Sequence, residues 1–137
     1  MFGKDGLLSF DYSYQDMSKA QLKPTNNPDF QSENQIITNE LASVSSFRVG
    51  GEYRIKQVSL RAGYRFEQSP YKNAITIGDL VGYSAGIGFN FGPSKLDLAM
   101  NRTNQDVIEG LFDSGITSPA FTNNINTNVT LSYTRNF

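Results

Sequence analysis

The clearest pattern in the chain is a double run of alternating apolar and polar positions between residues 47 and 68. In each run, every second position holds mainly an apolar or aromatic side chain, and the positions between them hold arginine, glutamate, serine and glycine. Alternation with a period of two is typical of a β-strand whose two faces lie in different environments. Only Lys56 and Gln57 separate the two runs. The sequence therefore predicts an antiparallel hairpin.

The same alternation recurs along the chain and predicts six strands, at Leu7–Gln15, Ser43–Ile55, Val58–Gln68, Leu80–Phe91, Lys95–Gln105 and Asn124–Phe137. The connections between these strands alternate between long and tight. A soluble sheet turns its apolar face to a core, whereas a transmembrane barrel turns it to lipid and alternates short turns with long loops. The loop lengths therefore favour an all-β, antiparallel transmembrane β-barrel meander over a soluble β-domain.

The first long connection, residues 16 to 42, allows more than one structure. Ser32 is a residue type that caps helices, so a short helix at Ser32–Leu41 is one expectation. Met17–Leu22 could instead prolong the first strand. The segment could also add two strands and so close an eight-stranded barrel, which is the small-barrel case. Without such closure, the two edge strands need partners from further strands.

Composition narrows the classes of function. The formal net charge of -1 argues against a nucleic-acid partner. The absence of Cys and His removes disulfides, thiolate metal sites and the commonest general base, so we expect no enzyme activity, cofactor or metal. No apolar run approaches the roughly 18 residues of a transmembrane helix. The length of 137 residues suggests one domain, residues 1–137, which we expect to be an incomplete barrel segment.

Six charged side chains of the central hairpin occupy the polar positions of the alternation, which a barrel would turn toward its lumen: Arg48, Glu52, Arg54, Arg61, Arg65 and Glu67. One interpretation is a set of cross-strand ion pairs that brace the wall. The other is a polar lining that contacts the carboxylate of a substrate. Because structural ion-pair networks are common, we favour the first.

Two further groups of residues are candidates for function. Apolar side chains in the last long connection could capture hydrophobic ligands or pack on one another: Leu111, Phe112, Ile116 and Phe121. The glycine-rich run at residues 86–92 lacks the strand-to-helix context of a phosphate-binding loop. Its glycines instead suggest a slim inner face that allows close packing.

The end of the chain carries a third signal, because Phe137 closes the last predicted strand four residues after Tyr133. A terminal aromatic residue in this position resembles the C-terminal signature of bacterial outer-membrane barrels. The stretches LLSFDYSYQD, SFRVGGEYRIKQVSLRAGYRFEQSPYK and IGDLVGYSAGIGFNFGPSKLDLAM also resemble the C-terminal part of the FadL-type outer-membrane transport protein family, in the form found in Bacteroidetes. This resemblance covers most of the chain outside its long loops.

The resemblance implies a fourteen-stranded barrel with an N-terminal plug in the outer membrane of a Gram-negative bacterium. Members of this family carry long-chain fatty acids or other hydrophobic small molecules by passive passage. The chain would supply the last six strands, with outer-membrane lipid, a hydrophobic ligand and the remaining barrel strands as partners. The plug has no counterpart in this chain. The family's other branch implies the alternative, a structural or interaction barrel that serves type IX secretion; a small closed barrel with binding loops belongs to the same class.

Overall fold

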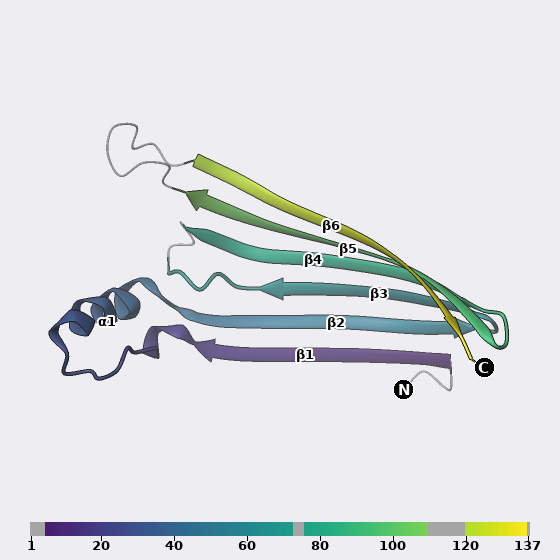
Figure 1. The fold of residues 1–137 in the computed structure, drawn as a ribbon, viewed down its shortest axis with the longest axis horizontal. Coiled ribbons are helices and arrows are strands. Elements are labelled where there is room, and N and C mark those ends of the chain that lie inside the picture. The colour runs from purple at the N-terminus through teal and green to yellow at the C-terminus, as the bar shows by residue number, and fades with distance from the viewer. Residues whose placement is uncertain (1–4, 73–75, 110–119, 137) are drawn as a thin grey trace.

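The computed structural model describes residues 5–72, 76–109 and 120–136. These residues form one antiparallel sheet whose strands follow one another in chain order (Figure 1). Its strands are β1 Gly6–Asp16, β2 Ser43–Ile55, β3 Val58–Glu67, β4 Ile77–Asn90, β5 Ser94–Glu109 and β6 Ala120–Arg135. The predicted all-β, antiparallel meander of six strands is therefore confirmed.

The strand bounds follow the alternation closely in the centre of the sheet and less well at its long-connection end. β2 begins and ends where the pattern predicts, and β3 ends one residue early. β5 continues to Glu109 and β6 begins at Ala120, so the predicted loop over residues 106–123 is too long. The reason is long-range, because the β5–β6 ladder continues through Val107 and Thr122 to its last pair, Glu109 and Ala120.

The first long connection contains a short 3-10 helix, η2 Met17–Lys19, and one α-helix, α1 Pro28–Glu40. The predicted helix is present, but its expected N-cap, Ser32, is wrong. Asn27 caps α1 instead: its side-chain oxygen accepts a hydrogen bond from the Asp29 backbone N–H at 3.0 Å, and Pro28 occupies the first turn. This asparagine–proline start is a strong local signal, because proline lacks the N–H that a first turn leaves unpaired.

The expectation that Met17–Leu22 prolongs β1 is also wrong. The Asp16 carboxylate accepts a hydrogen bond from the Ser18 backbone N–H at 3.2 Å and so turns the chain into η2. The hydrogen bond and charge of Asp16 also raise the pKa of Lys19 above its ordinary value. Residues 17–42 add no strand to the sheet, so the proposed eight-stranded closure through this segment is wrong as well.

The connections separate into two ends of the molecule. The turns between β2 and β3 and between β4 and β5 lie at one end, whereas α1 projects beyond the other end of the sheet (Figure 1). Lys56 with φ 54° and Gly92 with φ 86° adopt the left-handed backbone that the tight turns require. No helix among residues 5–72, 76–109 and 120–136 is long and apolar enough to cross a membrane.

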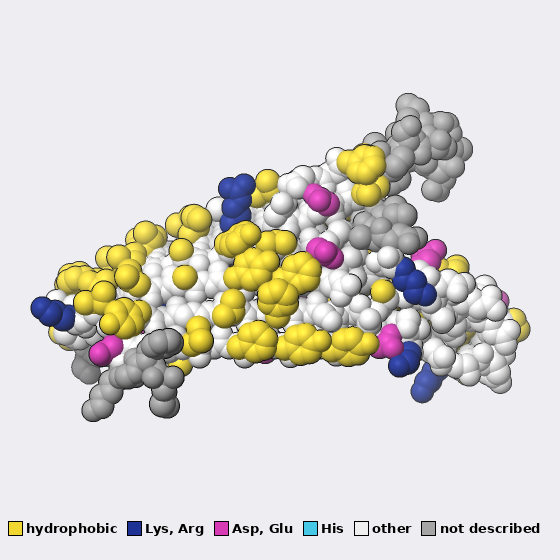
Figure 2. All heavy atoms as spheres, turned by 180° about the vertical axis from the view of Figure 1, so that it is seen from behind, with side chains coloured by type: hydrophobic (Ala, Val, Ile, Leu, Met, Phe, Trp, Pro, Cys, Tyr) yellow, Lys and Arg dark blue, Asp and Glu magenta, His cyan; other side chains and the backbone are white. Residues whose placement is uncertain are grey.

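The apolar positions of all six strands share one face of the sheet. The pairing register places Phe10 beside Val49, then Tyr64, then Tyr83. None of the apolar side chains that the structure describes is buried, and many are largely exposed, for example Phe10 at 70% and Tyr83 at 61%. Figure 2 shows them gathered over one side of the sheet. The sheet therefore has an apolar surface where a soluble domain would have a core.

These side chains form a band that crosses the sheet diagonally. Gly51, Ala62, Ala85 and Met100 are paired with one another across β2 to β5 and form one row across the sheet. We use the level of this row along the strands as a reference. The apolar stretch of β1 lies on the long-connection side of this level. The apolar stretches of β5 and β6 lie on the tight-turn side, at Leu96–Met100 and Val129–Tyr133. We call this surface the apolar band; Phe121 and Ile125 of β6 lie outside it.

Candidate functional site

Charged side chains on the opposite, polar face join into one network across the central strands. The Glu52 carboxylate accepts hydrogen bonds from Arg54 Nε at 2.5 Å and from Arg61 Nε at 2.8 Å. The other side of the Arg61 guanidinium donates to Asp97 Oδ1 at 2.8 Å, and Lys95 Nζ lies 2.9 Å from Asp97 Oδ2. The network thus ties β2, β3 and β5 together near the tight turns.

Glycines in β4 make this network possible. Arg61 on β3 has to reach across β4 to meet Asp97 on β5, and the residues of β4 nearest its path are Gly86 and Gly88. A Cβ atom at Gly88 would lie only 2.5 Å from Asp97 Oδ1. The missing side chain therefore provides the space in which the Asp97 carboxylate lies over β4. This is a specific use for the slim inner face that the glycine-rich run predicts.

The other charged residues on the polar face of the hairpin form fewer ion pairs and hydrogen bonds. Arg65 donates to Glu67 Oε2 at 2.9 Å, but its Nε is buried without a hydrogen-bond partner among the described residues. Arg48 lies directly opposite Arg65 and pairs with no carboxylate in the described ranges. The expectation that opposite charges pair across the hairpin is therefore confirmed for Glu52 and Arg61 and wrong for Arg48 and Arg65.

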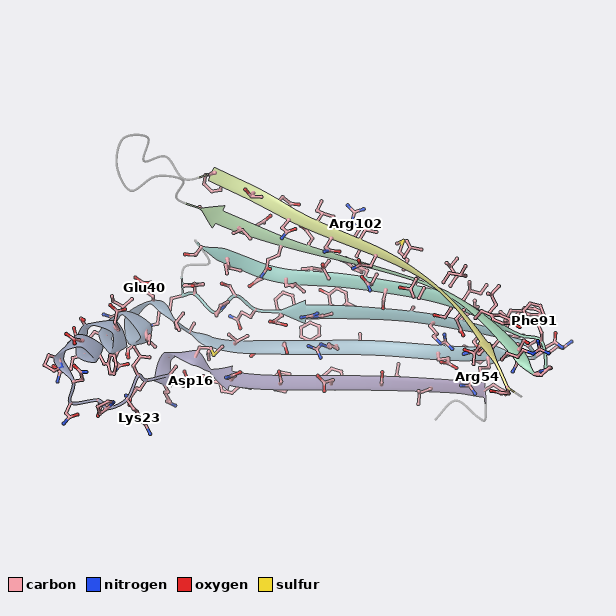
Figure 3. All side chains as sticks on the ribbon, in the orientation of Figure 1. Asp16, Lys23, Glu40, Arg54, Phe91 and Arg102 are labelled. Atoms are coloured by element: carbon pink, nitrogen blue, oxygen red, sulfur yellow. The ribbon has the colours of Figure 1, made fainter. Side chains whose placement is uncertain are left out.

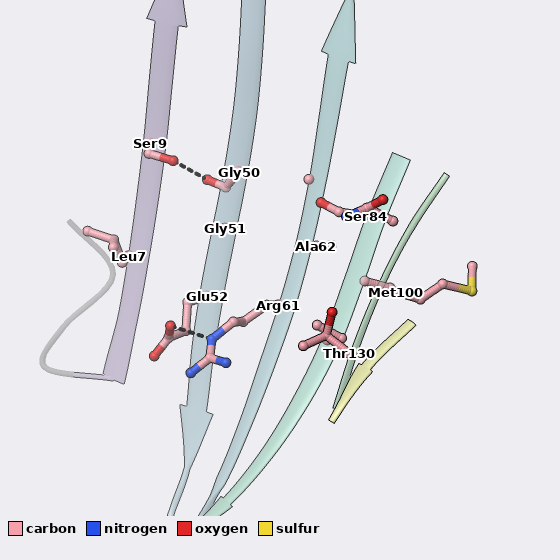
Figure 4. A pocket seen from close by; sticks show the side chains of 15 residues that line it. Leu7, Ser9, Gly50, Gly51, Glu52, Arg61, Ala62, Ser84, Met100 and Thr130 are labelled. Carbon is pink, nitrogen blue, oxygen red and sulfur yellow. Dashed lines mark hydrogen bonds and ion pairs between the residues drawn. The ribbon is translucent and has the colours of Figure 1, made fainter. Parts of the chain in front are cut away.

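A trough of about 360 Å³ lies beside the network on the polar face. It crosses all six strands, from Ser9 on β1 to Thr130 on β6, and most of its lining residues are small (Figure 4). Glu52 and Arg61 form its charged border. Within the described ranges, no group of three acidic, His or Cys residues could hold a metal ion. The trough is therefore shallow and open, with one charged border.

The predicted capture surface is only partly described. Leu111, Phe112 and Ile116 lie outside the described residues. Phe121, predicted to lie in a loop, belongs to β6 and is 79% exposed. This correction follows from the longer β5–β6 ladder, which draws residues 120–123 into the sheet.

Of the predicted C-terminal signature, Tyr133 is described and Phe137 lies outside the described residues. Tyr133 belongs to the apolar band, and its hydroxyl lies 3.0 Å from Ser94 Oγ at the tight-turn end of the sheet. An exposed tyrosine at the end of an apolar band has the amphipathic character of interfacial aromatic residues.

Sequence reasoning missed Asp97 and Lys95 as members of the network. The alternation of the sequence alone places both residues on the polar face of β5. Their approach to Arg61 depends on the register between β4 and β5, which local sequence patterns do not reveal. The useful signal is the coincidence of glycines on one strand with opposite charges on the strands to either side.

Glu52 should contribute more to stability than Glu67, because it accepts from two arginines whereas Glu67 accepts from one. We expect Glu52→Gln to lower the free energy of unfolding by about 1 kcal/mol and Glu67→Gln by about half as much or less. Equilibrium unfolding in urea, with the protein in detergent micelles, measures both. Equal losses for the two variants would contradict the network.

Comparison with known proteins adds no identification: no family model, no curated protein and no solved structure matches this chain.

Proposed function

We propose that this chain forms part of the wall of an outer-membrane β-barrel through which hydrophobic small molecules, such as long-chain fatty acids, pass without an energy source. The observation that carries the proposal is the apolar band, which lies on a sheet whose described apolar side chains are all at least partly exposed. Monomeric soluble proteins rarely expose contiguous apolar patches larger than a few hundred Å². A lipid environment is the one in which such a face is favourable.

The dimensions of the band support a membrane setting. On β2 it extends from Phe47 to Ile55, about 27 Å along the strand at a rise of about 3.4 Å per residue. Averaged from β1 to β6, the centre of the band shifts by roughly one residue per strand, which corresponds to a tilt of about 35° for strands about 4.8 Å apart. Its height along the membrane normal is then about 22 Å, close to the apolar band of about 25 Å on transmembrane barrels.

The two edges of the sheet support a barrel larger than the part described. β1 and β6 are the edge strands, and they do not pair with each other within the described residues. Unpaired backbone N–H and C=O groups in hydrocarbon cost several kcal/mol each, so spanning sheets close on themselves. Further strands beside β1 and β6 would satisfy these groups, as in the fourteen-stranded barrel that the resemblance implies.

The polar face supports the transport role. It would face the interior of the barrel, where the ion network braces the wall and the trough leaves room beside it. The choice of hydrophobic cargo comes from the resemblance to FadL-type proteins. Passage needs no reaction, so the polar face contributes only shape and charge.

The uptake of a labelled long-chain fatty acid tests this function. We expect the complete barrel that contains this chain to raise uptake several-fold in a Gram-negative host that lacks its own fatty-acid transporter. Gly86→Leu, which fills the trough, should reduce this uptake several-fold. The matched variant Ile87→Phe, at the neighbouring position on the apolar face and outside the lining of the trough, should leave it unchanged. Equal uptake with and without the protein in the membrane would contradict transport.

The second candidate is a structural or interaction barrel, such as a partner of a secretion pore. It is favoured by the folded connection between β1 and β2, in which Asn34 accepts from the Leu22 backbone N–H at 2.7 Å and donates to its carbonyl at 3.1 Å. A folded projection beyond the sheet is suited to contact another protein. Cross-linking in the outer membrane that yields a stable complex with a secretion pore, together with no uptake, would favour this candidate.

A further inference from the structure

Among the residues that the structure describes, Arg102 of β5 is the only charged residue on the apolar face at the levels of the apolar band. The register places it beside Tyr83 on β4 and Thr127 on β6, on the same face as Leu98 and Met100. Figure 3 shows its side chain projecting from the sheet at some distance from both ends of β5. A cation on an otherwise apolar surface requires a physical explanation.

No ion pair or hydrogen bond in the described part of the chain accounts for this charge. Among the described side chains, Arg102 donates to no carboxylate, carbonyl or hydroxyl oxygen. The carboxylates further along the same side of β4 and β5 have other partners: Asp106 accepts from Asn123 Nδ2 at 2.6 Å, and Asp79 accepts from the Ser69 backbone N–H at 2.7 Å. The guanidinium is exposed and its five donors are available.

The position of Arg102 within the diagonal band gives its depth in a bilayer. On the same face of β5, the residues that follow Arg102 toward the tight turn are Met100 and Leu98. Toward the long connection they are Asn104 and Asp106. An arginine on the lipid face is costly at the bilayer midplane and nearly free of cost at the interface. Arg102 therefore belongs at the border of the hydrocarbon layer, with its apolar stem against the sheet and its charge directed outward.

The neighbouring side chains complete an interfacial surface. Tyr83 is paired with Arg102 across the strands, and its ring lies 5.3 Å from that of Tyr64, which in turn lies 5.9 Å from Phe47. Aromatic residues gather at the two borders of transmembrane barrels, where their polar ends meet the headgroups. Here the rings run from β2 to β4 and end at the guanidinium on β5.

We propose that Arg102 binds the phosphate of an anionic lipid headgroup in the leaflet on the long-connection side. This inference rests on the membrane setting proposed above. A guanidinium offers two parallel N–H donors to a phosphate, and the outward charge is complementary to an anionic headgroup. The neighbouring Tyr83 hydroxyl adds a further donor at the same level. Arg102 would thereby hold the sheet at a fixed depth.

The test uses the intact protein reconstituted in vesicles of phosphatidylcholine, with or without added phosphatidylglycerol. We expect phosphatidylglycerol to raise the folding equilibrium constant of the natural protein about fivefold more than that of Arg102→Gln, which is the effect of one basic residue near an anionic surface. Arg102→Lys should keep part of the gain. Lys23→Gln, which removes a positive charge outside the sheet, should keep it in full. Equal gains for the natural protein and Arg102→Gln would overturn the proposal.

A second measurement separates this site from its membrane setting. The chain has no tryptophan, so an introduced tryptophan is its only indole fluorophore. Brominated acyl chains should quench Leu98→Trp on the apolar face strongly and Ala99→Trp on the polar face weakly. Weak quenching of Leu98→Trp would overturn the membrane setting itself. Strong quenching without the phosphatidylglycerol effect would overturn the headgroup site alone, as would inorganic phosphate that competes with the lipid.

Discussion

Ala85→Arg should reduce the folded stability of this protein in lipid vesicles by about 2–4 kcal/mol, the cost of an arginine that faces lipid near the bilayer midplane. Ala85 lies near the centre of the apolar band, where its neighbours across the strands are Ala62 and Met100. It is already exposed, so the substitution makes no buried clash and creates no cavity. The loss comes from the medium that the face contacts.

Ser84→Arg is the matched control, because the adjacent side chain points to the opposite face. On a polar inner face the same arginine should change stability by about 1 kcal/mol or less, as usual for exposed polar positions. Unfolding of both variants in guanidinium with vesicles present, followed by the shift in gel mobility on heating, provides the comparison. If both arginines are tolerated equally, the apolar band does not face lipid.

Gly88→Ala should lower stability by about 1–2 kcal/mol, the scale of losing charge-assisted hydrogen bonds. The new Cβ atom would lie 2.5 Å from Asp97 Oδ1, so the carboxylate would have to move away from Arg61 and Lys95. Gly86→Ala is the control, because its nearest contact would be 3.4 Å, at the Leu98 carbonyl. It should be tolerated.

A double-mutant cycle attributes the Gly88→Ala loss to the network. In a protein that already carries Asp97→Ala, the Gly88→Ala substitution should cost little, because no carboxylate remains to be displaced. Urea unfolding in detergent micelles gives the four free energies. Additive losses would mean that the glycine is required by the backbone and not by the carboxylate over it.

The sequence predicts those parts of the fold that depend on neighbours along the chain. The hairpin from Phe47 to Glu67 is predicted because alternation and a tight turn are both local. The start of α1 is also locally encoded, by Asn27 and Pro28, which form a stronger start signal than the N-cap residue type at Ser32. The ends of β5 and β6 depend on pairing between the two strands, which the loop-like composition of residues 106–123 conceals.

The candidate site divides in the same way. Parity correctly places Glu52 and Arg61 on one face, and their pairing follows once the hairpin register is known. The link to Asp97 needs the registers of two further strand pairs and the absence of a side chain at Gly88. The isolation of Arg102 likewise emerges only when the apolar positions of six strands are aligned.

The alternation of tight and long connections also determines an order of assembly. Hairpins with tight turns close their ends at little entropic cost and form in about 1–10 μs. The β2–β3 and β4–β5 pairs have such turns, whereas β1 meets β2 only after residues 17–42 have been looped back. Loop-closure entropy grows with loop length, so β1 should join late. In the folded protein, the hydrogen bond from the Met17 backbone N–H to the Ala42 carbonyl at 3.2 Å closes the base of that loop.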